Sequence, residues 1–330
     1  MKVVVTDYVE ENLDWEAEEC RRAGIEFAAF QLKFRPEAEV LARVADADVI
    51  VVNMVRFGAS LVSKLTRCRL IIRHGAGYDN VDVEACTRQG IALANQPDCY
   101  TVDVAEHAIA LIFACARKVV WSRRWLEESS AKGVWHYAGL FPMHRMDGMT
   151  LGIVGLGRIG ARVYHKLRHF GMKIIAADPY LSEKQKAEFD VEFVDVKTLF
   201  RVADFVTIHT PLNPETGRLV DAEMLRLMKP TAYLINTSRG LLVDAAALAQ
   251  ALRERRIAGA ALDVFDIEPP PPDHPLLGLD NVILTPHIGW ASEESAQEIR
   301  RSIVNDILAC SRGGTASSVV NRDALKKSRS

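Results

Sequence analysis

The chain lacks the features that mark membrane proteins, nucleic-acid-binding proteins and zinc proteins. None of its apolar runs reaches the roughly 18 residues of a membrane-spanning helix, and its first residues, MKVVVTD, are typical of a strand rather than a signal peptide. The net charge is only −2, which gives no reason to expect nucleic acid as a partner. The six cysteines form no Cys-x-x-Cys pair, so we expect reduced thiols, no bound metal and a cytoplasmic protein.

The length and composition are those of a globular protein with more than one domain. At 330 residues the chain exceeds the usual size of a single hydrophobic core, so about two domains are expected. Hydrophobic residues make up 49% and charged residues 25%, both ordinary for soluble globular proteins. A ligand therefore has to be inferred from a site rather than from composition.

Apolar runs alternate with amphipathic stretches in the first part of the chain. This alternation predicts parallel strands joined by helices that cover both faces of a sheet. Two helices are predicted at 9–24 and 81–90, and each ends in a glycine suited to a C-cap. The strands are predicted at 2–7, 25–30, 47–52, 69–73 and 91–95.

Residues 151–160 read LGIVGLGRIG and form the most informative motif of the chain. The β-like run LGIV leads into Gly155, Gly157 and Gly160, which have the G-x-G-x-x-G spacing. The apolar residues that follow predict a helix over 158–172. Such a turn lets the backbone and the helix N-terminus approach a pyrophosphate group.

The next apolar run, 173–178, completes a β-α-β unit and ends in Asp178. An acidic side chain in this place can accept hydrogen bonds from the ribose hydroxyls of adenosine, and it repels a 2′-phosphate. The order of strand, turn, helix, strand and acid therefore favours NAD over NADP. The alternative is a glycine-rich turn in an ordinary α/β sheet with a solvent-facing Asp178.

Two long helices flank the second half of the chain. The helix predicted over 101–129 has apolar residues on more than one face, so we expect it to be buried between domains or against another subunit. The last helix is predicted to begin after Ser292 as N-cap, with Ser295 where a capping box would have Glu or Gln. The tail after Gly314 is expected to be loosely held.

The expected fold is α/β with two doubly wound parallel-sheet domains. Further strands are predicted after the glycine motif, at 204–209, 231–237, 257–264 and 281–286. We expect the last helix to return the chain to the first domain. A Rossmann NAD-binding domain, 99–290, is then inserted into a discontinuous flavodoxin-like substrate domain, 1–98 and 291–330.

Three polar side chains follow predicted strands: Arg239, Glu268 and His287. Ligands of doubly wound sheets bind beyond the carboxyl ends of the strands, so we expect the three to share one crevice. Arg239 suits a substrate carboxylate, His287 suits proton transfer near neutral pH, and Glu268 suits a hydrogen bond to the far nitrogen of the imidazole. Each taken singly is also compatible with an ordinary turn, a solvated loop or a structural histidine.

Two further places have weaker signals. Asp263, at the end of a predicted strand, either contacts the nicotinamide amide or makes a structural hydrogen bond to a neighbouring loop. The small residues Gly75, Ala76 and Gly77 form a loop whose amides could bind a carboxylate, or else they form a tight connection. We interpret His107 as structural.

Together, GLGRIG with Asp178, INTSRG, DVFDIEP and TPHIG resemble the motifs of the D-isomer-specific 2-hydroxyacid dehydrogenase family. The resemblance covers nearly the whole chain, including HGAGYDNVD and VAEH. EPPPPDHPLL and TPHIGWASEES are similar to the branch of phosphoglycerate dehydrogenase-like proteins and C-terminal-binding-protein corepressors.

The resemblance implies the cofactor NAD, a homodimer, and Arg239, Glu268 and His287 as catalytic residues. The implied cofactor contacts are Gly155, Gly157, Arg158, Ile159, Gly160, Asp178, Thr210, Thr237, Ser238, Arg239, Asp263, His287 and Gly289. The implied substrate contacts are Gly75, Ala76, Gly77, Arg239 and His287.

We therefore expect an NAD-dependent oxidoreductase that interconverts a D-2-hydroxy acid and its 2-keto acid. Its expected partners are this small acid and a second copy of the chain, with neither nucleic acid nor a membrane. The alternative is an NAD(H)-binding regulatory dimer with little turnover, like the corepressors. Asn53, Met54 and Arg56 do not reproduce a phosphate-binding arginine pattern, which argues against a phosphorylated substrate.

Overall fold

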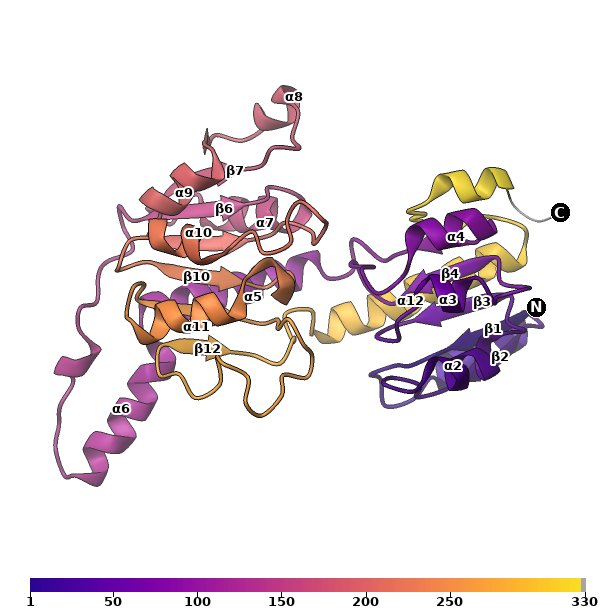
Figure 1. Ribbon diagram of the computed structural model, residues 1–330, viewed down its shortest axis with the longest axis horizontal. Helices are drawn as coiled ribbons and strands as arrows, with labels where there is room; N and C mark the ends of the chain where they lie inside the picture. Colours follow the sequence, from indigo (N-terminus) through magenta and orange to yellow (C-terminus); the bar gives the residue numbers. More distant parts are fainter. Residues whose placement is uncertain (328–330) are drawn as a thin grey trace. The chain divides into compact units, whose positions relative to one another are not determined.

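The computed structural model describes residues 1–327 and divides the chain into two compact units. Unit 1 comprises Met1–Tyr100 with Ala291–Ser330, and unit 2 comprises Thr101–Trp290. Each unit is built on one parallel sheet covered by helices, so the predicted α/β class is confirmed (Figure 1). No helix within the described residues is long and apolar enough to cross a membrane.

The sheet of unit 1 has five strands in the order β2-β1-β3-β4-β5, which is the flavodoxin-like order. All pairs are parallel, and Val4 of β1 lies opposite Ala28 of β2 and Ile50 of β3. The strands are β1 (Lys2–Val5), β2 (Glu26–Ala29), β3 (Val49–Val52), β4 (Leu70–Arg73) and β5 (Ala92–Ala94).

Helices cover both faces of this sheet because successive strand residues point to opposite sides. Val3 and Val5 pack with α1 (Asp14–Arg22) and α12 (Glu293–Ser311). Val4 packs on the other face. The helices of that face are α2 (Glu37–Val44), α3 (Ala59–Val62) and α4 (Val83–Gln89).

Unit 2 has a seven-stranded parallel sheet in the order β12-β11-β10-β9-β6-β7-β8. The chain starts at β6, moves outward to β7 and β8, and then returns to the other side of β6 as β9. This reversal is the switch point of a Rossmann fold. The strands are β6 (Thr150–Val154), β7 (Lys173–Ala177), β8 (Glu192–Phe193), β9 (Phe205–Ile208), β10 (Tyr233–Asn236), β11 (Gly259–Leu262) and β12 (Val282–Leu284).

The two faces of this sheet bury different helices. Ile153 packs on the face covered by α5 (Thr101–Ala116) and α7 (Arg158–Leu167), whereas Val154 packs on the opposite face. That second face is covered by α9 (Val196–Val202), α10 (Ala222–Leu227) and α11 (Ala245–Arg253). The remaining helical segments of unit 2 are α6 (Val119–Ala131), α8 (Glu183–Lys186), η1 (Ala138–Leu140) and η2 (Gly240–Leu242).

Several predicted helix bounds are wrong. The helix expected over 101–129 is two helices, because the chain turns at Lys118, whose φ is +52°. The helix expected over 158–172 ends at Leu167, and Phe170 beyond it is 51% exposed. The helix expected over 9–24 begins only at Asp14.

The C-terminal region also differs from expectation. Ser292 and Ser295 form a reciprocal capping box, because the serine hydroxyl replaces the usual Glu or Gln. The tail after Gly314 is packed rather than loose over the described residues, which include η3 (Arg322–Lys327). Asn321 accepts a hydrogen bond from the Leu93 amide at 2.7 Å, and Val319 pairs with Ala94.

Candidate active site

The predicted trio lies at the carboxyl ends of three neighbouring strands of unit 2. Arg239 follows β10, Glu268 lies in the segment after β11, and His287 follows β12. Because β10, β11 and β12 are adjacent and parallel, their ends open at the same edge of the sheet. Residues distant in sequence are thereby brought to one place.

Glu268 and His287 are joined by a hydrogen bond of 2.7 Å between Oε2 and Nδ1. Burial alone would raise the pKa of Glu268. The hydrogen bond and charge of His287 have a larger combined effect, together with the Phe265 amide and the charge of Arg239, and the pKa is lowered below its usual value. Glu268 is therefore ionised and accepts the Nδ1 proton. This leaves Nε2 of His287 as the nitrogen that can exchange a proton with a substrate.

His287 has a φ of +54°, in the left-handed region that side chains other than glycine rarely adopt. The turn is held by the buried carboxylate of Asp263, which accepts hydrogen bonds from the amides of Ile288 (3.0 Å) and Gly289 (2.8 Å) and from the Thr285 hydroxyl (2.5 Å). His107 of α5 lies 3.4 Å from the same carboxylate. These contacts support the structural interpretation of Asp263 and His107.

Arg239 sits on a turn that the side chain of Asn236 shapes. The Asn236 amide donates to the Arg239 carbonyl at 2.8 Å and accepts from the Ser238 amide at 3.0 Å. The Ser238 hydroxyl donates to the Ile208 carbonyl at 2.8 Å, which ties the turn to β9. Asn236 is only 1% exposed, and it could not be singled out from the sequence because its only signal there is a lone amide at the end of a buried strand.

The glycine motif forms the turn between β6 and α7. Gly155 has a φ of +88°, and a Cβ there would lie 2.8 Å from the His209 carbonyl oxygen. A Cβ on Gly160 would clash with the carbonyl oxygen of Gly155, whereas one on Gly157 would meet nothing within 4 Å. The turn is therefore tightly packed at Gly155 and Gly160, but it is open at Gly157, where α7 begins.

Other predicted cofactor residues lie around this turn. Asp178 follows β7 and accepts hydrogen bonds from the amides of Leu156 (2.8 Å) and Tyr180 (2.9 Å). Thr210 follows β9 and Thr237 follows β10, and both are buried. The Thr237 hydroxyl has no hydrogen-bond partner among the described residues.

These features fit a dinucleotide. An open glycine at a helix N-terminus admits a pyrophosphate, and an orphaned hydroxyl can be satisfied by a polar group of the ligand. Within residues 1–327, the His, Cys, Asp and Glu side chains form no group of three that could hold a metal ion.

The predicted loop of unit 1 follows β4. Two of its carbonyl oxygens accept hydrogen bonds. The backbone amide of Gln96 donates to the Gly75 carbonyl at 2.9 Å, and the Asn95 side chain donates to the Ala76 carbonyl at 2.7 Å. Among the described residues, no hydrogen-bond acceptor pairs with the backbone amides of Ala76 and Gly77. A loop with fixed carbonyls and unused amides is suited to an anion.

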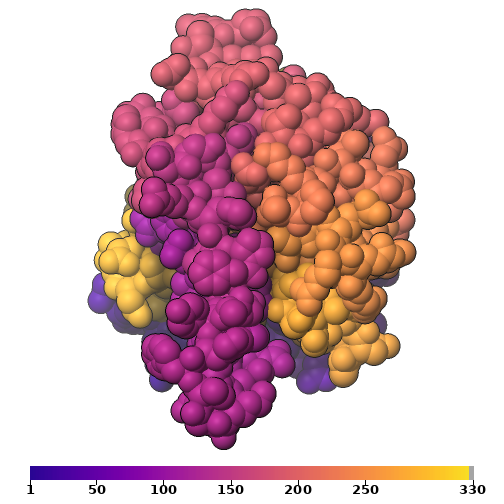
Figure 2. All heavy atoms as spheres, turned by 90° about the vertical axis from the view of Figure 1, so that its left-hand side faces the viewer, coloured from indigo at the N-terminus to yellow at the C-terminus, as the bar shows by residue number. Residues whose placement is uncertain are grey.

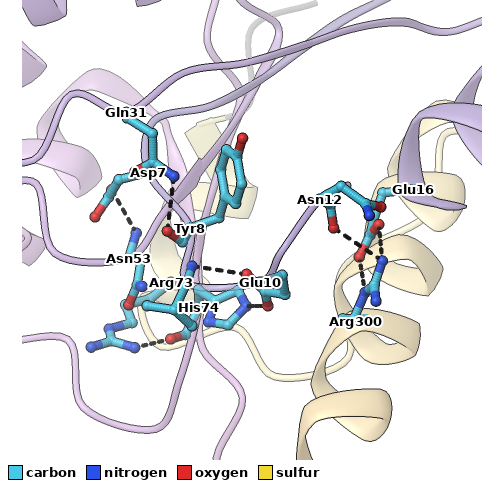
Figure 3. A network of polar contacts seen from close by, with 11 residues as sticks. Asp7, Tyr8, Glu10, Asn12, Glu16, Gln31, Asn53, Arg73, His74 and Arg300 are labelled. Atoms are coloured by element: carbon cyan, nitrogen blue, oxygen red, sulfur yellow. Dashed lines mark hydrogen bonds and ion pairs between the residues drawn. The ribbon is translucent and has the colours of Figure 1, made fainter. Parts of the chain in front are cut away.

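A buried hydrogen-bonded pair of side chains lies directly before this loop. Glu10 Oε1 and His74 Nε2 are 2.9 Å apart and point toward one another, and both side chains are about nine-tenths buried (Figure 3). Asp7, nearby, accepts hydrogen bonds from the amides of Asn53 (3.3 Å) and Met54 (2.7 Å) in the loop after β3. Buried carboxylates thus hold two loops at the carboxyl edge of the sheet.

Glu10→Gln is expected to lower the free energy of unfolding at pH 7 by about 2 kcal/mol. Burial raises the pKa of Glu10, but the hydrogen bond and charge of His74 lower it from 4.5 to about 2. A carboxyl whose pKa is depressed by folding stabilises the protein above pH 4.5, and that stability is lost as the pH falls toward 2.

Urea denaturation of wild type and variant at pH 7 and pH 3.5 tests this expectation. The difference in unfolding free energy between the two proteins should be smaller at pH 3.5 than at pH 7. Glu84→Gln, at an exposed glutamate, is the control, and a difference that does not depend on pH would contradict the pair's role.

Comparisons with known proteins show the family of the chain. Residues 109–289 match the family model described as "D-isomer specific 2-hydroxyacid dehydrogenase, NAD binding domain". A glyoxylate reductase of Korarchaeum cryptofilum is 40% identical over 87% of this chain and 86% of its own length. A D-3-phosphoglycerate dehydrogenase of Methanocaldococcus jannaschii is 39% identical over 97% of this chain but only 59% of its own length.

A crystal structure of a protein from Thermus thermophilus has the same fold. Its TM-score is 0.86 at 35% identity, and the match covers 97% of this chain and 100% of that one. The family model spans more than half of the chain, and the curated relatives extend the similarity to nearly all of it. The chain belongs to the D-isomer specific 2-hydroxyacid dehydrogenase family.

Proposed function

We propose that the protein is an NAD-dependent oxidoreductase that interconverts a D-2-hydroxy acid and its 2-keto acid. The observation that carries the proposal is the 2.7 Å contact between Glu268 and His287 at strand ends that Arg239 shares. An ionised carboxylate, an imidazole with its outer nitrogen available and a guanidinium are the groups that proton transfer beside a substrate carboxylate requires.

The three residues have different tasks in this reaction. Arg239 binds the substrate carboxylate through its planar donors and polarises the adjacent carbonyl oxygen. His287 donates a proton from Nε2 to that oxygen during reduction and accepts it during oxidation. Glu268 fixes the ring through Nδ1 and stabilises the imidazolium. NAD, when bound, supplies the hydride-accepting nicotinamide.

We assign the cofactor to unit 2 and part of the substrate site to unit 1. The proposed NAD domain is 99–290 and the proposed substrate domain is 1–98 with 291–330. Gly75, Ala76 and Gly77 are proposed to form the substrate-carboxylate loop, with the backbone amides of Ala76 and Gly77 as the donors, because the Gly75 amide already donates to the Arg73 carbonyl at 2.9 Å. The proposed cofactor contacts are Gly155, Gly157, Arg158, Ile159, Gly160, Asp178, Thr210, Thr237, Ser238, Arg239, His287 and Gly289. For Asp263, the hydrogen bonds to the turn 285–289 support a positioning role, and its contact with nicotinamide stays a prediction.

A panel of 2-keto acids tests the proposal. Glyoxylate, hydroxypyruvate, pyruvate and 3-phosphohydroxypyruvate are each incubated with NADH or NADPH, and oxidation of the cofactor is followed at 340 nm. We expect turnover of at least one unphosphorylated acid and a preference for NADH, because Asp178 repels a 2′-phosphate. Binding of NADH without turnover of any acid would favour the regulatory alternative instead, and a preference for NADPH would contradict the role of Asp178.

We also propose that the protein forms a homodimer through the arm formed by residues 119–141. The arm is ordered by its own contacts, since the Trp125 indole donates to the His136 carbonyl at 2.6 Å and its ring packs on Gly139. The arm nevertheless lies at the surface of the molecule (Figure 2), and many of its large apolar side chains are exposed. The large exposed apolar residues of the arm are Val119, Val120, Leu126, Val134, Trp135, Tyr137 and Phe141.

Trp135 is 83% exposed, and an apolar patch of this kind is typical of a surface that a partner covers. We expect the double variant Leu126→Glu with Trp135→Glu to be monomeric under conditions in which wild type is dimeric, as measured by sedimentation velocity. Phe34→Glu, at an exposed aromatic residue outside the arm, should leave the dimer intact. A monomeric wild type, or a double variant that stays dimeric, would contradict the proposal. A cytoplasmic location stays a prediction.

A further inference from the structure

The segment that carries Glu268 is long and has no regular structure of its own. It runs from the end of β11 at Leu262 to the start of β12 at Val282 through turns and irregular backbone. Irregular segments of this length rarely hold one conformation without ties between their residues. Catalysis of the proposed kind needs Glu268 in one conformation, so the ties within the segment are functionally important.

His274 makes the central tie. Its side chain is only 3% exposed, and its Nε2 lies 2.8 Å from Oδ1 of Asp266. Its Nδ1 accepts a hydrogen bond from the Leu276 amide at 3.4 Å. Because Nδ1 is an acceptor, the neutral ring carries its proton on Nε2 and donates it to Asp266. The ring edge also packs on Phe265, with centroids 5.5 Å apart and planes at 87°.

The residues that His274 holds are the ones that place Glu268. The Phe265 amide donates to Oε1 of Glu268 at 3.0 Å, and Oε2 of the same carboxylate contacts His287. The backbone of Phe265 and Asp266 also packs so closely on Gly240 that a Cβ there would clash with it. Since Gly240 follows Arg239, this contact links the two halves of the site.

We propose that His274 is a positioning residue that, through Asp266 and Phe265, holds Glu268 in the orientation in which it supports His287. This inference rests on the proposed function of Glu268 and His287. The segment itself carries Asp263, Asp266, Glu268, Asp273 and Asp280. The cations beside it include Arg239 at the end of β10, Arg253 of α11, which donates to the Pro275 carbonyl at 2.9 Å, and Arg255, which pairs with Asp280 at 2.7 Å.

The variant His274→Phe keeps an aromatic ring against Phe265 and removes both polar contacts. We expect kcat for keto-acid reduction to fall about tenfold with little change in KM. The pH–rate profile should also change, because a poorly placed Glu268 stabilises the imidazolium less. The limb on which activity falls with rising pH should move to lower pH. Asp266→Ala should have the same effects, and His274→Gln, whose amide can still donate to Asp266, should recover most of the activity.

A double-mutant cycle separates positioning from general stability. If His274 acts through Glu268, then His274→Phe should lower kcat by less than about twofold in a Glu268→Gln background. A tenfold fall in that background as well, or an unchanged pH–rate profile in the single variants, would overturn the inference. NADH affinity is the check on folding, and Asp266→Ala replaces His274→Phe in the cycle if that variant does not fold.

The same cycle distinguishes the inference from the proposed function. If Glu268→Gln changes kcat and the pH–rate profile but His274→Phe and Asp266→Ala do not, only the positioning role of His274 is wrong. If Glu268→Gln itself changes neither, the role of Glu268 in the proposed function is wrong and the inference fails with it.

Discussion

The variant His287→Asn is expected to reduce kcat for keto-acid reduction by about 10²- to 10⁴-fold, the range that general acid–base catalysis contributes. Asparagine keeps a polar group at the site but cannot donate a proton at neutral pH. Because Arg239 remains, KM for the keto acid should change much less than kcat. Steady-state kinetics with NADH and the best substrate of the panel measure both constants.

A matched control variant separates the loss of proton transfer from a general loss of folding or cofactor binding. His169→Asn changes an exposed histidine just beyond α7 and should leave kcat unchanged. The NADH dissociation constant of His287→Asn, from fluorescence titration, should stay within a fewfold of wild type. Turnover within about tenfold of wild type would show that another group transfers the proton, since a positioned general acid is worth at least roughly 10².

Sequence patterns predict where residues lie in the fold when a short segment fixes its own geometry. The strand at 151–154, the glycine turn and Asp178 belong to one β-α-β unit, and Asp178 accepts a hydrogen bond from the amide of Leu156 within the turn. Arg239, Glu268 and His287 could be grouped from the sequence alone because parallel strands end at one edge of the sheet.

The residues that hold the site in shape were not predictable in the same way. Asn236, Asp266 and His274 act through contacts between chain segments, and their types and spacing match no local pattern. The left-handed conformation of His287 is also set from outside, by the Asp263 carboxylate on the neighbouring strand. Such features depend on which segments meet, and only the assembled sheet determines that.

Local structure was mispredicted where tertiary contacts override sequence periodicity. The apolar spacing of 101–129 continues through Lys118, where the chain nevertheless breaks without a glycine or proline to signal it. The polar tail after Gly314 is fixed by the side chain of Asn321, which bonds to the backbone of Leu93 and Ile91. In both places the deciding interaction lies outside the window that a pattern covers.

The same substitution at two glycines of the motif should weaken NADH binding at both but lower stability at only one of them. Gly157→Ala is expected to leave stability unchanged, because the new methyl group would meet no protein atom within 4 Å. It should nevertheless weaken NADH binding at least about tenfold, roughly 1.4 kcal/mol, because the methyl group would lie where we propose that the pyrophosphate approaches the backbone. Thermal unfolding and fluorescence titration measure the two effects separately.

Gly160→Ala should lower both stability and NADH affinity. The methyl group would overlap the carbonyl oxygen of Gly155, so α7 has to move away from β6, at a cost of about 1–3 kcal/mol or more. For a domain of this size the cost corresponds to a fall in Tm of at least a few degrees. Gly58→Ala in unit 1, where a Cβ also meets nothing within 4 Å, should change neither property. If Gly157→Ala bound NADH as tightly as wild type, the cofactor would not bind at the open side of the turn. If Gly160→Ala were as stable as wild type, the tight packing of Gly160 on Gly155 would be wrong, but the cofactor site would not be affected.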